Sequence, residues 1–225
     1  MNLPSQRAGT GVLAALLILA QSTEAQSPAE GRRFEGILEF KAQNLERLQF
    51  YNCFVKGSRI RVQQAEQGET TLYEILDLAD GKIYSVLAGR EQYVEAPLEV
   101  SKRSVEVQLD DEMETIADYP CDHLLLKTES EEVEVWASKA FGGIGGFRRA
   151  IIEEPMTWER QLMALGFTPL RSIVRDLDGN EKARIEVTKV VRKSVSNTIF
   201  HVPRDYVKVA ELDLSTPKAI IRKKR

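Results

Sequence analysis

The sequence has few residues of the kinds that bind metals. Its 225 residues include only two histidines, His123 and His201, and two cysteines, Cys53 and Cys121. Neither histidine has a second cysteine or an acidic spacing motif nearby, as a zinc site would require. The acidic runs lack the regular Asp/Asn spacing and the glycine of a calcium-binding loop. We therefore predict no metal site and no cofactor.

One local cluster does combine reactive residue types. In a strand, Cys121 and His123 would share a face, so a thiolate–imidazolium pair is geometrically allowed. The sequence supplies no identifiable orienting group or oxyanion hole for such a pair. The prediction is that the chain has no catalytic residues and is not an enzyme. A packed or disulfide-bonded cysteine beside a surface histidine is the expected arrangement.

An excess of charge of one sign is also missing. Lysine and arginine number 31 against 34 aspartates and glutamates, which gives a net charge of -3. This balance does not indicate a polyanionic partner, and no basic face with interleaved aromatic residues points to nucleic acid. The one basic cluster, Arg222 to Arg225, belongs to a tail at 214–225. We expect that tail to be solvated, with contact to anionic head groups as the alternative.

The one long apolar run is too short to cross a membrane. Residues 11–20 read GVLAALLILA, whereas a spanning helix needs about 20 apolar residues. Arg7 precedes the run and the small residue Ala25 follows it, which is the pattern of a secretory signal peptide at 1–25. Residues 21–26 include no cysteine for lipid attachment. We therefore expect a product that is exported to the periplasm or the extracellular medium without a stable membrane anchor.

Export would affect whether the two cysteines form a disulfide. An oxidising compartment and an even cysteine count favour a disulfide between Cys53 and Cys121. The alternative is a pair of buried thiols that act as small hydrophobic side chains.

Period-two alternation dominates the chain after a polar lead at 26–32. Residues 34–40 alternate apolar and charged side chains, and residues 48–56, 59–64, 72–78, 83–87, 92–95, 112–117, 121–128, 132–138, 170–177 and 181–192 also read as strands. Asp80–Gly81 marks a hairpin turn. Residues 98–109 fit neither the strand period nor the helix period. With no repeat or linker visible, we predict one domain at 33–213.

A helical insertion interrupts this pattern between Phe141 and Leu165. Its first part, FGGIGGF at 141–147, does not match a phosphate-binding loop. Helical spacing follows at 148–154 and 157–165, with Gly166 as a C-terminal cap. The expected fold is mainly β (α+β): a curled antiparallel sheet, or incomplete β-barrel, whose concave apolar face is covered by this insertion.

Such an apolar face under a helix can bind a hydrophobic ligand. The residues predicted to line the cavity and its lid are Trp136, Phe141, Phe147, Trp158 and Leu162. The same residues would equally well fill an ordinary core, and the glycine-rich stretch would then be a plain connection.

Three stretches resemble a family of secreted bacterial proteins of the DUF4412 type. They are YNCFVKGSRIR at 51–61, ETIADYPCDHLLLKT leading to EVEVW at 114–136, and FHVPRDYVK at 200–208. Asp118 and Asp205 stand where the family pattern more often has glycine. That family is similar in turn to the periplasmic lipoprotein-carrier (LolA/LppX-like) superfamily. The resemblance implies a half-barrel that holds lipid or acyl chains, and it carries over no catalytic residues.

Together these observations predict a binding or carrier protein for a hydrophobic ligand, such as a lipid, an acyl chain or a lipoprotein anchor. The alternative is a ligand-free interaction or structural domain of the cell envelope, which would bind an envelope protein by a sheet edge or by residues 98–109. An enzyme that uses Cys121 and His123 is the third hypothesis.

Overall fold

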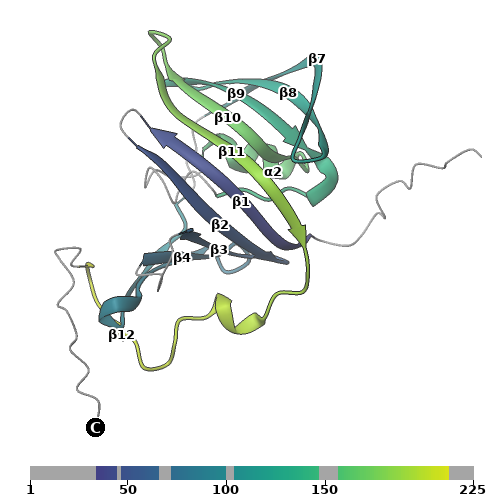
Figure 1. Ribbon diagram of the computed structural model, residues 1–225. Helices are drawn as coiled ribbons and strands as arrows, with labels where there is room; N and C mark the ends of the chain where they lie inside the picture. The colour runs from purple at the N-terminus through teal and green to yellow at the C-terminus, as the bar shows by residue number, and fades with distance from the viewer. Residues whose placement is uncertain (1–33, 45–46, 66–71, 100–103, 147–156, 213–225) are drawn as a thin grey trace, which may run out of the picture. The chain divides into compact units, whose positions relative to one another are not determined.

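The computed structural model describes residues 34–44, 47–65, 72–99, 104–146 and 157–212, which form one 12-stranded sheet (Figure 1). In chain order the strands are β1 (Glu35–Asn44), β2 (Leu48–Lys56), β3 (Arg59–Gln64), β4 (Leu72–Asp77), β5 (Lys82–Leu87), β6 (Gln92–Pro97), β7 (Glu106–Ile116), β8 (Tyr119–Lys127), β9 (Glu131–Ser138), β10 (Thr168–Asp176), β11 (Glu181–Arg192) and β12 (Val207–Lys208). The described residues also form the short 3-10 helices η1 (Ala88–Arg90), η2 (Lys139–Phe141) and η3 (Asn197–Phe200) and the α-helix α2 (Trp158–Ala164). The expected signal peptide, polar lead, helix at 148–154 and basic tail lie outside the described residues.

The sheet is open, and its strand order is β12-β6-β5-β4-β3-β2-β1-β11-β10-β9-β8-β7. Every neighbouring pair is antiparallel except β12 and β6. This arrangement confirms the predicted mainly β fold with an incompletely closed antiparallel sheet. No helix in the described part of the chain is long and apolar enough to span a bilayer.

Alternation along the strands explains why this sequence forms a sheet with one apolar face. In β1, Leu38, Phe40 and Ala42 are buried while the residues between them are partly exposed. Period-two placement of apolar residues puts them on one face, and that face drives packing. The long pairing of β1 with β11 then joins the two ends of the domain, with a bulge between Glu39 and Phe40.

The ambiguous segment 98–109 resolves into the beginning of a long strand. β7 begins at Glu106 and continues to Ile116, although the sequence predicted a strand only from 112. Residues 100–103 lie outside the described residues. A register shift between Leu109 and Met113 interrupts the pairing of β7 with β8, and this irregularity hides the strand period in the sequence.

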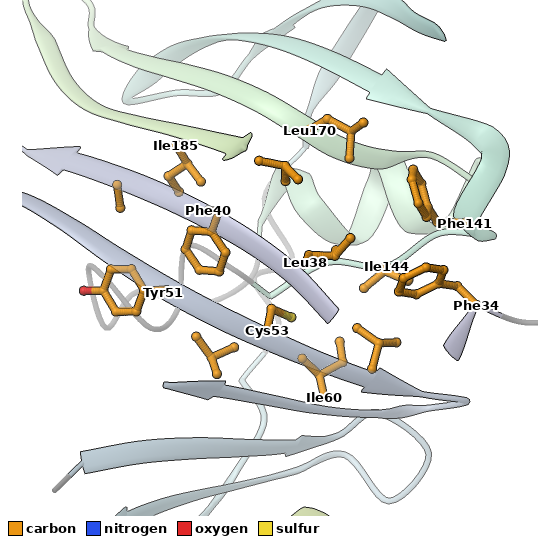
Figure 2. Packing of buried hydrophobic residues seen from close by; sticks show 14 of the residues in the cluster. Phe34, Leu38, Phe40, Tyr51, Cys53, Ile60, Phe141, Ile144, Leu170 and Ile185 are labelled. Carbon is orange, nitrogen blue, oxygen red and sulfur yellow. The ribbon is translucent and has the colours of Figure 1, made fainter. Parts of the chain in front are cut away.

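The largest buried cluster lies at the centre of the sheet (Figure 2). It joins β1, β2 and β3 to β10, β11 and the segment after β9; the labelled members are Phe34, Leu38, Phe40, Tyr51, Cys53, Ile60, Phe141, Ile144, Leu170 and Ile185. Phe40 stacks on Tyr51 with ring centroids 5.1 Å apart.

The chain after β11 forms a strap across β3 to β6, which we define as residues 193–209. Lys56 Nζ donates to the carbonyl of Val195 (2.8 Å), and Arg61 Nη1 donates to that of Ile199 (3.2 Å). Val202 and Tyr206 pack against a separate apolar cluster on β4 and β5 that includes Tyr73, Ile75 and Val86. The motif FHVPRDYVK therefore has a structural role here, because it holds the strap and brings β12 to the edge of β6.

Candidate functional site

Helix α2 places its apolar side chains against the sheet formed by β8 to β11. Trp158 and Leu162, four residues apart, occupy one helix face and are fully buried. Their cluster contains Leu124, Leu126, Val133, Val135, Ala137, Phe167, Val174 and Ala183. This confirms the expected helix and its contact with the apolar face of the sheet.

The helix ends as the sequence predicted. Gly166 adopts a left-handed conformation (φ 80°), and its N–H donates to the carbonyl of Met163 (3.0 Å). The N–H of Phe167 donates to the carbonyl of Leu162 (2.9 Å), which completes a Schellman motif. The motif turns the chain back into β10 and so fixes α2 beside that strand.

In the described part of the chain, side chains fill most of the space beside α2. A cavity of about 10 Å³ lies beside Trp158, between Glu159 and the β10 and β11 residues Pro169, Leu170, Arg171, Ser172 and Ile185. That volume is about the minimum needed to hold one water molecule. A ligand of acyl-chain size would have to replace side chains of α2 rather than enter this cavity.

The glycine-rich stretch packs on α2. The N–H of Ile144 donates to Thr168 Oγ1 (2.8 Å), and the N–H of Gly146 donates to Oε1 of the buried Glu159 (3.0 Å). A side chain at Gly143 would lie 2.5 Å from the carbonyl oxygen of Met163. These glycines therefore allow a close approach to the helix, a role that differs from phosphate binding.

This contact gives a test by substitution. We expect Gly143→Ala to lower the free energy of unfolding by about 1–3 kcal/mol more than Gly142→Ala does. Both glycines have a positive φ (74° and 76°), so both variants carry similar backbone strain, but nothing lies within 4 Å of a side chain at Gly142. Urea denaturation of both variants measures the difference, and equal midpoints would contradict the close contact.

Phe141 lies in the central cluster, apart from the α2 cluster. Its ring meets Phe34 edge-on at 5.2 Å and Tyr119 at 4.6 Å. The Arg192 guanidinium lies 5.7 Å from the Phe141 ring, and its Nη2 donates to the carbonyl of Ala140 (3.1 Å). Phe141 thus anchors the start of the insertion to the end of β11.

Trp136 lies on the other side of β9 from the α2 cluster. Val135 and Ala137, its neighbours in the strand, both belong to that cluster, and strand alternation points Trp136 away from it. Its ring stacks on His123 at 4.7 Å and lies 5.2 Å from the Arg171 guanidinium, which pairs with Glu114 (2.7 Å).

The four described members of the predicted cavity set lie in or against two neighbouring clusters. The structure brings Trp158 and Leu162 together in the α2 cluster. Phe141 belongs to the central cluster, and Trp136, which points away from α2, packs against that same cluster. Phe147 lies outside the described residues.

Both cysteines are unpaired and fully buried, as in the buried-thiol alternative to a disulfide. Burial raises the pKa of the Cys121 thiol to about 11 and raises the pKa of the Cys53 thiol well above its usual range. Cys121 Sγ donates to the carbonyl of Tyr119 (3.5 Å).

The expectation of a surface histidine was wrong, because His123 is buried against the ring of Trp136. Within the described residues neither of its ring nitrogens makes a hydrogen bond, although Nδ1 lies 3.4 Å from Asp110. Within the described ranges, no group of three or more His, Cys, Asp or Glu side chains is placed to hold a metal ion.

A polar pocket lies over β7 to β10, where the sequence predicted no site. It has a volume of about 240 Å³, and its charged lining residues are Glu106, Lys127, Glu132, Glu134 and Arg175. Lys127 pairs with Glu132 (2.7 Å) and Arg175 with Glu134 (3.2 Å). Side chains of opposite charge thus lie next to one another across the strands, as is typical of a solvent-exposed face. Exposed ion pairs of this kind each contribute about 0–1 kcal/mol to the free energy of unfolding.

Comparison with known proteins gives a family and a fold. The sequence model described as "Domain of unknown function (DUF4412)" matches residues 34–206. No curated protein matches the sequence. An uncharacterized conserved protein from Thermus thermophilus aligns with a TM-score of 0.53 and 15% identity, over 78% of this chain and 90% of that one. It shows that the fold occurs in another protein.

Other solved structures align less closely. MucB in the Pseudomonas aeruginosa MucA/MucB complex has a TM-score of 0.47 and 11% identity, over 83% of this chain and 69% of that one. A further MucB structure has a TM-score of 0.47 and 13% identity, and this chain spans 59% of its length.

Proposed function

The chain belongs to the DUF4412 family, and we propose that it is an exported binding protein that holds a hydrophobic ligand between α2 and the sheet. The observation that carries the proposal is the seating of Trp158 and Leu162 of one short helix in a cluster whose other buried members are all apolar side chains from β8 to β11 and from Phe167. The exported, lipid-carrying character that the sequence resemblance implies is consistent with this site.

The proposed mechanism is exchange. A ligand chain takes the place of the α2 side chains against residues such as Leu126, Val133 and Val174, and the helix moves away. α2 has seven residues, and a helix this short is not stable in water without its packing. It would therefore unfold as it leaves the sheet when another apolar group replaces its side chains.

Magnitudes favour such an exchange. Exposing Trp158 and Leu162 costs about 1.5–3 kcal/mol for each side chain, whereas burying a chain of about ten methylenes returns about 8 kcal/mol. The Trp158 Nε1 is buried and has no hydrogen-bond partner within the described part of the chain. A buried donor without a partner destabilises the folded protein by about 1–3 kcal/mol. Moving the indole into water removes this penalty and so lowers the net cost of the exchange.

The two tryptophans allow a direct test with lauric acid as the probe. In Trp136→Phe, Trp158 is the only tryptophan left, and we expect its emission to shift to longer wavelength as laurate binds, because the indole leaves its buried position. Trp158→Phe is the matched control: Trp136, on the other side of β9, should keep its emission. Native mass spectrometry counts the bound laurate in the same samples.

Protein purified from the exporting compartment without detergent supplies the second readout. A lipid-sized ligand recovered by solvent extraction would support the proposal and name the ligand class. Failure to bind laurate would favour the ligand-free envelope domain. Bound laurate with unchanged Trp158 emission would place the ligand elsewhere and contradict this site.

A further inference from the structure

The two edges of the sheet differ in how far another strand of the described residues covers them. At one edge, β12 covers β6: the N–H of Val207 donates to the carbonyl of Glu91 (2.8 Å), and that of Val209 to the carbonyl of Tyr93 (2.9 Å). Lys208 adds an ion pair with Glu95 (3.0 Å). At the opposite edge, no strand of the described residues pairs with the outer side of β7. Among the described residues, this eleven-residue strand therefore presents main-chain groups that no other strand pairs with.

The side chains of β7 combine two apolar anchors with a high negative charge. Leu109 is 61% exposed and Met113 is 70% exposed, although strand edges seldom leave such residues in water. Five of the eleven residues are acidic and none is basic; the acidic residues are Glu106, Asp110, Asp111, Glu112 and Glu114.

One carboxylate of β7 pairs with a cation within the sheet, and two others make no ion pair with the described residues. Glu114 pairs with Arg171 (2.7 Å), and Asp110 lies 3.4 Å from His123 Nδ1. Asp111 and Glu112 are exposed and make no ion pair within the part of the chain that the structure describes. Both stand in the bulge, where β7 carries two more residues than β8 between Leu109 and Met113.

Bulges and charges at an edge normally prevent strands from adding to it. On β7, the bulge and the acidic residues would favour some partner strands over others. Two copies of this chain, paired through β7, would bring their acidic residues together, and like charges across a strand pair are destabilising. A basic strand would meet complementary charge at the bulge and apolar contact at Leu109 and Met113.

We propose that β7 is a docking edge for an extended segment of another protein in which basic and apolar residues alternate. The segment adds to the sheet through main-chain hydrogen bonds, and the acidic bulge supplies specificity and faster association. This site is separate from the α2 cluster, so the β7 proposal and the ligand proposal can fail independently.

A suitable probe is a labelled peptide of about ten residues in which lysine and valine alternate. This length is sufficient for one strand, because strands are commonly about five or six residues long. We expect the peptide to bind the folded protein, and the glutamate–valine counterpart not to bind. The double variant Asp111→Lys/Glu112→Lys should weaken binding by about tenfold or more, because it reverses the charge at the bulge. Asp80→Lys/Asp205→Lys, which alters two exposed turn residues outside β7 and its neighbour β8, is the matched control and should bind as the natural chain does.

A lysine–valine peptide with N-methylated main-chain nitrogens separates strand addition from simple charge attraction. It keeps the charge but cannot donate main-chain hydrogen bonds. Loss of binding on methylation, together with the effect of the β7 variant, supports the proposal. It is overturned if the methylated peptide binds equally well, if both double variants weaken binding to the same extent, or if the unmethylated peptide does not bind.

Discussion

Replacing Phe40 by alanine is expected to lower the free energy of unfolding by about 3–5 kcal/mol, the range for removing a buried aromatic side chain. Phe40 is 1% exposed, stacks on Tyr51 and lies on β1, which pairs with β2 on one side and β11 on the other. Its removal would leave a cavity in the cluster that joins the first and last long strands. Urea denaturation followed by circular dichroism measures the loss.

The matched control is Phe50→Ala on the adjacent strand. Phe50 pairs in register with Lys41, next to Phe40, but its side chain is 54% exposed. We expect a change within about 0.5 kcal/mol, as for most surface substitutions. A similar loss in both variants would mean that the central cluster does not dominate the stability of this domain.

The same alternation that identifies Phe40 made most of the fold predictable from the sequence. Buried and exposed side chains alternate along β1 and β2, and the Asp80–Gly81 turn joins β4 to β5 as expected. These are local signals, since a strand period needs only a few consecutive residues and a hairpin turn needs two.

Pairing of distant strands was not predictable. β1 lies beside β11, with Leu38 opposite Val190, and no local pattern states which strands become neighbours. β7 was partly missed for a different reason, because its bulge breaks the period-two pattern that defines a strand.

The candidate site was likewise predictable only in part. Helical spacing correctly joined Trp158 to Leu162. The structure places Trp136, also predicted as a cavity residue, against the central cluster and away from α2. Its neighbours Val133, Val135 and Ala137 alternate with it, and this parity was already a signal that Trp136 points the other way. The cavity residues were predicted from their residue types. The face of the sheet on which a strand side chain lies is instead decided by its position in the strand.

Both thiols are expected to resist alkylation in the folded protein. With the pKa of Cys121 raised to about 11, its thiolate fraction at pH 8 is lower than that of a free cysteine, with a pKa of about 8.5, by roughly 200-fold. Only the thiolate reacts, and burial also blocks the reagent, so iodoacetamide should modify Cys121 at least that much more slowly before unfolding than after it. Cys53, whose pKa burial raises further, should react more slowly still.

The variants Cys53→Ala and Cys121→Ala assign each rate to one thiol, and mass spectrometry counts the alkyl groups with and without urea. If Cys121 reacted rapidly in the folded protein at pH 8, its surroundings would be stabilising a thiolate, and an enzyme using Cys121 with His123 would regain support. If unfolded but unreduced protein took up no alkyl group and was lighter by the two thiol hydrogens, export would have formed the disulfide. Slow labelling before unfolding and full labelling afterwards would assign both sulfurs to the core, where they fill space beside the apolar strands and take no part in chemistry.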